Sequence, residues 1–149
     1  GKDELFRAIL EQKGQELVAL VRAVAARDEP PLSQLHALIE AYIDYFVRHP
    51  SFLRMHLRAG TSWVVSPEPN AESRARVWQE VHTLQAEIFR RGIEAGVFID
   101  DDPSFLARLF SAMDQVLLAG WVGGGMKESR DELIARLAVI VERSFRRRA

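Results

Sequence analysis

A chain of 149 residues that is 48% hydrophobic is long enough to bury the core of one domain, and the absence of cysteine excludes disulfide frameworks, thiolate nucleophiles and cysteine-ligated zinc. The formal net charge of −1, from 20 basic and 21 acidic residues, gives no overall field that would draw the chain to nucleic acid or anionic lipid. The first residues are polar and lack the pattern of a signal peptide, so we expect a cytoplasmic protein.

Apolar residues recur at helical spacing along almost the whole chain, and Pro, Gly, Asn or Asp stand where helices must end. This pattern predicts an all-α fold of six helices without a sheet. The first three helices are expected over residues 2–26, 32–48 and 51–63, because the Pro30–Pro31 pair ends the first helix and Pro50 closes the second.

The last three helices carry recognisable start and stop signals. Proline in the first helical position and a capping box both mark helix starts, because they leave few backbone N–H groups unpaired. The expected helices are residues 71–95 (N-cap Asn70, stop Gly96), a helix from Asp102 and Pro103 to Gly123–Gly125, and a helix that opens on the capping box of Ser129 and Glu132.

The stretch from Phe105 to Val122 is apolar around most of its circumference and is about as long as a membrane span. Arg108 and Asp114 lie inside it, and each charge near a bilayer centre costs about 2.5–3.5 kcal/mol. We therefore interpret it as a buried helix of a soluble protein, with no membrane partner.

A helix packed on one side needs an apolar stripe only a little wider than about 100°. The helix over residues 105–122 has two such stripes, and the last helix repeats the pattern more weakly. We therefore expect a homodimer in which the last two helices of each copy form an intersubunit four-helix bundle. The open alternative is a central helix enclosed by the other five. The predicted interface is Leu109, Ala112, Val116, Ala119, Gly120, Leu137 and Val141.

Residues 2–10 (KDELFRAIL) and residues 91–98 (RGIEAGVF) are two segments that resemble the tetracycline-repressor (TetR) family of regulators. The opening residues 2–10, KDELFRAIL, resemble the junction between that family's DNA-reading helix and its long connecting helix. Residues 91–98, RGIEAGVF, with the following Asp102–Pro103 and the helix from Phe105 to Trp121, resemble its passage into the dimerisation helices. The resemblance covers residues 1–149 as the regulatory domain. The family's three-helix DNA-binding head has no counterpart upstream of Gly1.

The resemblance implies a function. The chain would be the effector-sensing and dimerisation domain of a transcriptional repressor. A small hydrophobic or aromatic ligand in the helical core would move the first helix and release the full-length protein from operator DNA. Operator DNA would be a partner only through the missing N-terminal head.

In the resembled family the second to fifth helices surround the ligand pocket, and aromatic residues fall on the core-directed faces of these helices. Hydrogen-bonding groups on otherwise apolar faces would orient the ligand. Plain core packing remains the alternative for each aromatic residue. The predicted ligand-binding residues are Tyr42, Phe46, Met55, Trp63, Trp78, His82, Gln85, Met113, Asp114 and Leu117.

Other kinds of site are less well supported by the residues. His36 and Glu40 lie one helical turn apart, and His56 and His82 lie on other helices, but this spacing occurs by chance and we expect no metal or cofactor. Residues 120–129 are rich in glycine but lack the Gly-Lys-Ser/Thr order of a phosphate loop, so we interpret them as a helix stop.

We expect no enzymatic activity, because no serine elbow, Cys/His pair or carboxylate dyad is present. The arginines after residue 142 complement the negative end of the last helix, an interpretation that we prefer to a DNA-binding tail. The main alternative function is a helical homodimerisation or protein-interaction module without a ligand pocket. A third is an enzyme or carrier that holds a cofactor in a helical bundle.

Overall fold

The computed structural model describes residues 1–65 and 72–148, and for residues 59–65 and 72–75 it describes the backbone alone. This part of the chain forms six α-helices, and its one β pairing is an isolated bridge between Phe98 and Arg146. The all-α prediction is therefore confirmed. The helices are α1 (Lys2–Ala25), α2 (Pro31–Arg48), α3 (Pro50–Val65), α4 (Glu72–Glu94), α5 (Pro103–Gly123) and α6 (Arg130–Phe145).

The helix starts follow local side-chain chemistry. Asp102 caps α5 by accepting a hydrogen bond from the backbone N–H of Phe105 at 3.2 Å, and Ser129 caps α6 by accepting one from Glu132 at 3.2 Å. Pro50 does more than close α2. It is the first residue of α3, where its missing N–H costs nothing, so only His49 separates the two helices.

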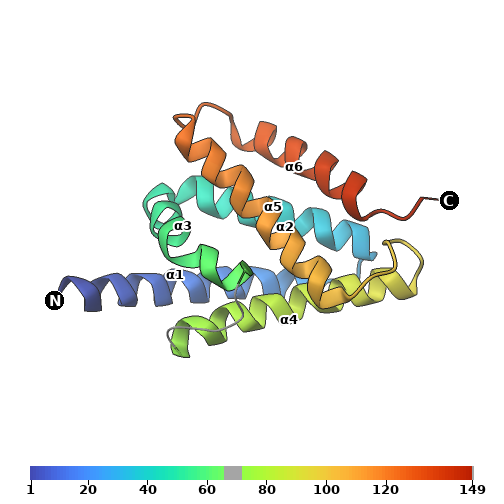
Figure 1. Ribbon diagram of the computed structural model, residues 1–149, viewed down its shortest axis with the longest axis horizontal. Helices are drawn as coiled ribbons and strands as arrows, with labels where there is room; N and C mark the ends of the chain where they lie inside the picture. Colours follow the sequence, from blue (N-terminus) through green and yellow to red (C-terminus); the bar gives the residue numbers. More distant parts are fainter. Residues whose placement is uncertain (66–71, 149) are drawn as a thin grey trace.

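α2 is the central helix of the bundle, because it contacts each of the other five helices. α1 and α4 lie side by side along one edge of the molecule, and α5 crosses from α4 towards α6 (Figure 1). α1 and α4 approach closely where Gly14 faces Val77, since a Cβ at position 14 would lie 3.2 Å from the Cγ1 atom of Val77. The same two helices are joined by a two-pronged ion pair between Arg22 and Glu80 at 2.7 Å.

The C-terminal end of α1 is held by a side chain of α2. The Nε2 atom of the fully buried Gln34 donates to the carbonyls of Arg27 at 3.0 Å, Ala25 at 3.3 Å and Val24 at 3.4 Å. These carbonyls lie where an α-helix leaves its last acceptors without intrahelical partners. Gln34 therefore fixes the end of α1 against α2.

The connection from α4 to α5 is compact. Gly96 has a φ of +73°, the left-handed conformation that ends many helices, and Val97 N–H donates to the carbonyl of Gly92 at 2.8 Å. Phe98 is fully buried and lies directly over Gly92. A Cβ at position 92 would lie 2.1 Å from the Cδ2 atom of Phe98, so only glycine fits there.

The end of the chain is fastened to this connection. Ile99 N–H donates to the carbonyl of Phe145 at 2.8 Å, and Arg147 N–H donates to the carbonyl of Val97 at 2.8 Å. Residues 97–99 and 145–147 thus form a short antiparallel pairing. The residues after α6 are therefore part of the fold.

α5 buries one face and leaves the other open. Leu106, Phe110 and Leu118 are buried, whereas Leu109 is 37% exposed and Val116 is 72% exposed. The alternative of a fifth helix enclosed by the other five is therefore wrong. α5 is long and apolar enough to span a membrane by length and composition, yet its buried side packs against α2, α3, α4 and α6.

α6 differs from the expectation in which residues face outward. Leu137 and Val141, predicted in the interface, are 1% and 0% exposed and pack in the core of the chain. The exposed large apolar residues of α6 are Val139 and Ile140. Two apolar stripes on one helix do not show which of them faces inward, which explains the error.

Candidate functional site

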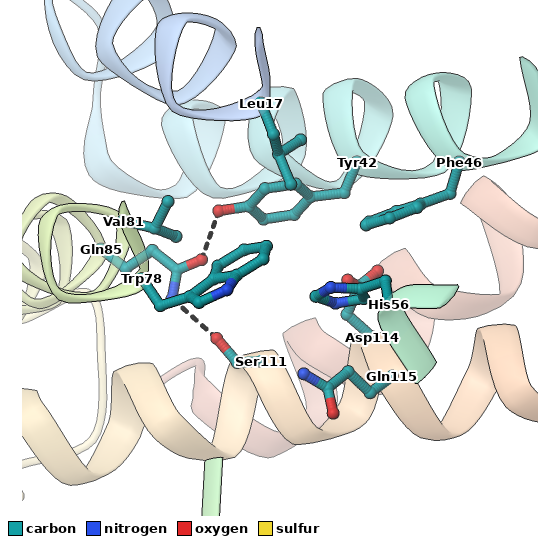
Figure 2. A pocket seen from close by; sticks show the side chains of 10 residues that line it. All are labelled: Leu17, Tyr42, Phe46, His56, Trp78, Val81, Gln85, Ser111, Asp114 and Gln115. Carbon is teal, nitrogen blue, oxygen red and sulfur yellow. Dashed lines mark hydrogen bonds between the residues drawn. The ribbon is translucent and has the colours of Figure 1, made fainter. Parts of the chain in front are cut away.

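A small cavity of about 20 Å³ lies where α1 to α5 meet (Figure 2). Its volume suits about one ordered water molecule, since a water needs roughly 10–15 Å³ of such space. All five helices contribute side chains to its wall. The lining residues are Leu17, Tyr42, Phe46, His56, Trp78, Val81, Gln85, Ser111, Asp114 and Gln115.

Helical spacing explains why these residues meet. Residues three or four apart lie on one face of a helix, as Tyr42 and Phe46 do on α2. Ser111, Asp114 and Gln115 follow the same rule on α5 and bring three polar groups to the cavity (Figure 2). The apolar face of α5 is therefore interrupted by a polar floor at the cavity.

A hydrogen-bond chain crosses one side of the cavity. The hydroxyl of Tyr42 donates to the Oε1 atom of Gln85 at 2.5 Å, and the Nε2 atom of Gln85 donates to the hydroxyl of Ser111 at 2.9 Å (Figure 2). The same Nε2 atom lies 3.4 Å from the carbonyl of Ala107. Burial, followed by the nearby Asp114, raises the pKa of Tyr42 well above its ordinary value, so the phenol remains a donor.

Aromatic rings form the opposite wall. The ring of His56 lies 5.1 Å from Phe46 in a stacked arrangement and 4.7 Å from Trp78. Phe46 is also stacked on Phe52 at 5.7 Å. These contacts hold the rings in fixed orientations around the polar floor.

Asp114 and Gln115 differ from the other polar groups of the cavity. Both are only 7% exposed. Within the described part of the chain, the Oδ1 atom of Asp114 and the Nε2 atom of Gln115 have no hydrogen-bond partner. Burial raises the pKa of Asp114 to about 7. The carboxyl group is therefore divided between its neutral and charged forms near neutral pH.

The structure brings together five of the ten predicted ligand-binding residues at this cavity: Tyr42, Phe46, Trp78, Gln85 and Asp114. Trp63 belongs to α3, but its side chain, like the predicted N-cap Asn70, lies outside the described residues. Whether the five residues bind a ligand stays a prediction.

Four other predicted residues lie away from the cavity wall. Met55, Met113 and Leu117 are half-buried residues packed against the core. His82 lies between α4 and α5, where its Nε2 atom is 2.8 Å from the hydroxyl of Ser104. Burial, followed by nearby Arg108, lowers the pKa of His82.

Five residues of the wall were not predicted. Ser111 and Gln115 were detectable, because they lie three residues before and one residue after Asp114 in a helix that is otherwise apolar. Val81 belongs to the apolar stripe of α4 and could not be separated from ordinary core residues. Leu17 and His56 line the cavity because α1 and α3 pass close to it. The positions where helices cross cannot be predicted from the local sequence.

The histidines do not gather at one place. Among the described residues no group of three metal-ligating side chains converges. His36 lies between α2 and α6, with its Nε2 atom 3.4 Å from the Oε1 atom of Glu142. In the segment after α5, Gly125 has a φ of +88° and Met126 N–H donates to the carbonyl of Trp121 at 2.8 Å, the geometry of a helix end.

The described part of the chain is thus a six-helix bundle with a small cavity lined partly by polar groups and with an open apolar face on α5. Residues 28–144 match the family model described as "Tetracyclin repressor-like, C-terminal domain". The match covers more than half of the chain, so the chain belongs to this family of non-enzymatic regulator domains. The sequence-based resemblance and the expectation of no enzymatic activity are both confirmed. No curated protein matches the sequence.

Solved structures of TetR family regulators share the fold. PfmR, a TetR family transcriptional regulator from Thermus thermophilus, has a TM-score of 0.76 and 22% identity, and the match covers 97% of this chain and 76% of PfmR. A putative TetR family regulator from Shewanella sp. PV-4 gives a TM-score of 0.76 at 12% identity, covering 99% of this chain and 77% of that one. A TetR family regulatory protein from Rhodococcus RHA1 gives 0.75 at 18% identity, covering 96% and 73%. At these identities the likeness concerns the fold.

Proposed function

We propose that residues 1–149 are the effector-sensing and dimerisation domain of a cytoplasmic TetR-like transcriptional repressor. DNA binding would belong to a part of the protein outside these residues. The observation that carries the proposal is the cavity, because α1 and the four helices after it share its wall and its floor holds buried polar groups without partners. The family match supports the same role.

The packing of α1 suggests how an effector would act. Leu17 of α1 faces the cavity, and α1 is joined to α4 at Gly14 and through the Arg22–Glu80 ion pair. A ligand larger than one water must displace part of the wall, so α1 and α4 would shift with it. A ligand favours one arrangement only by its differential affinity for the two, typically about 1–3 kcal/mol.

The open faces of α5 and α6 support dimerisation through these helices. On α5 the predicted interface residues Leu109, Ala112, Val116, Ala119 and Gly120 lie on or beside the exposed side. On α6 we propose Val139 and Ile140 in place of Leu137 and Val141. Large apolar residues exposed on two neighbouring helices favour an association site there.

A thermal-shift screen of small hydrophobic and aromatic compounds tests the sensing role. A ligand specific to the folded state adds RT ln(1 + [L]/Kd), about 2.7 kcal/mol at one hundred times Kd, and should raise the melting temperature. Ser111→Val places a methyl group in the cavity and should weaken the hits. Ser33→Val, an exposed position on α2, is the matched control and should leave them unchanged.

A dimerisation module without an effector is the second candidate. The cavity volume of about 20 Å³ favours it, because drug-sized ligands occupy pockets of about 300–1,000 Å³. A screen without stabilising compounds, together with a persistent dimer, would select this function over the first.

A further inference from the structure

The polar groups of the cavity fall into two sets. The first set, Tyr42, Gln85 and Ser111, forms the hydrogen-bond chain already described and is satisfied within the protein. The second set, the Oδ1 atom of Asp114 and the Nε2 atom of Gln115, is buried and has no partner in the described part of the chain. Buried polar groups without partners are rare and costly, so this pair calls for an explanation.

The charges around the cavity are unbalanced. Among the described lining residues, Asp114 is the one carboxyl group, and none is a lysine or an arginine. The other titratable groups among the described lining residues are Tyr42 on α2 and His56 on α3, while the described side chains that α1 and α4 contribute are uncharged. A buried carboxylate without a cation is strongly disfavoured, and burial accordingly raises the pKa of Asp114 to about 7.

The remaining wall suits a positive charge. The rings of Phe46, Trp78 and Tyr42 face the same small space as Asp114 (Figure 2). Aromatic faces attract cations through their quadrupole, and tryptophan does so most strongly. An anionic ligand would be repelled by the carboxylate, and a neutral ligand would gain no charge–charge attraction from it.

We propose that the effector of this domain is an organic cation, with a protonated amine and an adjacent hydrogen-bond acceptor on an apolar or aromatic body. The ammonium group donates to the Oδ1 atom of Asp114, and the acceptor receives the N–H of Gln115. The inference rests on the proposed sensing function. The cavity as it stands has room for the polar head alone, so the apolar body enters by displacing side chains of the wall.

Three probes of one shape test the proposal: 2-amino-1-phenylethanol as the cation, 1-phenyl-1,2-ethanediol as its neutral counterpart, and mandelate as the anion. Calorimetric titrations at pH 8, where Asp114 is mostly ionised and the amine mostly protonated, should give at least about tenfold tighter binding for the amine than for the diol. Mandelate should not bind. At pH 6 the affinity of the amine should fall by about tenfold, because Asp114 must first lose its proton.

Variants assign the effect to Asp114. Asp114→Asn should abolish both the preference for the amine and its pH dependence, whereas His56→Gln should retain the pH dependence. Asp131→Asn removes a carboxyl group that is 87% exposed on α6 and should change neither property. The pH dependence of the unmutated protein tests the proposal even if Asp114→Asn does not fold.

Three results would overturn the inference: equal or tighter binding of the diol or mandelate, an unchanged amine preference in Asp114→Asn, or no binding of the amine and its longer-chain analogues. Binding of the diol or mandelate would still support the sensing function. The proposed sensing function itself would be rejected only if, in addition, the broad thermal-shift screen found no ligand of any charge.

Discussion

Asp114 should make the stability of the folded chain depend on pH. Its pKa is about 7 in the fold and 3.8 ordinarily, so the folded state binds the proton more tightly than the unfolded chain. The stabilisation is therefore fully present at low pH and is lost as pH rises towards 7. Between pH 4 and 7 this group should lower the free energy of unfolding by about 1.4 kcal/mol per pH unit.

Urea denaturation of the unmutated protein and of Asp114→Asn from pH 4 to pH 8 measures this slope. The difference between the two proteins should grow across that interval and level off above pH 7. Asp131→Asn, which alters an exposed carboxyl group, controls for general charge effects. Parallel pH profiles for Asp114→Asn and the unmutated protein would contradict the assignment.

Gly92 is a second residue whose identity the fold requires. In Gly92→Ala the new methyl group would overlap the ring of the fully buried Phe98, and such overpacking typically costs about 1–3 kcal/mol. Chemical denaturation should show this loss. Gly123→Ala is the control: nothing lies within 4 Å of its Cβ position, so alanine should be neutral or stabilise by up to about 1 kcal/mol.

At the scale of residues, the sequence could predict the part of the site that periodicity reveals. Tyr42 could be identified because its aromatic side chain falls on the core-directed face of its helix, and Gln85 and Asp114 because each is a polar group on an apolar face. His82 satisfied the same criterion, yet it lies at the α4–α5 surface beside Ser104. A shift of about one helical turn along α4 separates a side chain in the core from one at the surface, and the spacing of residues in the sequence resolves that difference poorly.

The end of α1 depends on one side chain of α2. Gln34→Met keeps the size of the side chain but removes the donor to the part-buried carbonyls of Ala25 and Arg27 at the end of α1, and leaving such acceptors without a partner costs about 1–3 kcal/mol. The free energy of unfolding from urea titration should fall by that amount. Glu40→Met makes a similar replacement at an exposed position of the same helix and should have little effect. Equal effects of the two variants would rule out this role.

Helix limits could be predicted because capping is local chemistry. Asp102, Ser129 and Gly96 mark the ends of helices in the structure as they do in the sequence. The dual position of Pro50, which ends α2 and begins α3, could not be read in the same way. Proline is compatible with both positions, so its presence alone does not decide between them.

Val116 is the most exposed large apolar residue of the described chain and should lie in the dimer interface. Val116→Glu would bury a charge there, so sedimentation velocity at micromolar concentration should show a dimer for the unmutated protein and a monomer for the variant. Leu5→Glu changes a residue of α1 that is 63% exposed, away from this face, and should leave the dimer intact. An unmutated protein that sediments as a monomer would refute the interface.

At the scale of the molecule, the all-α class follows from periodicity, and the excess apolar surface of α5 was visible as two stripes in one helix. The central position of α2 could not be predicted from the sequence, although α2 contacts every other helix. A helix that is fully buried in its own chain and a helix that buries one apolar face against a second chain have similar compositions. Only the packing of the other five helices separates them.

Chain ends are usually frayed and are the first residues that exopeptidases remove. Arg147 differs from a frayed terminal residue, because its N–H donates a hydrogen bond to the carbonyl of Val97. Loss of this bond would loosen the segment between α4 and α5 that contains the buried Phe98. Carboxypeptidase digestion of a polypeptide of residues 1–149 should therefore slow as it reaches residue 147. Trimming beyond that point should lower the melting temperature, although the arginines removed are exposed.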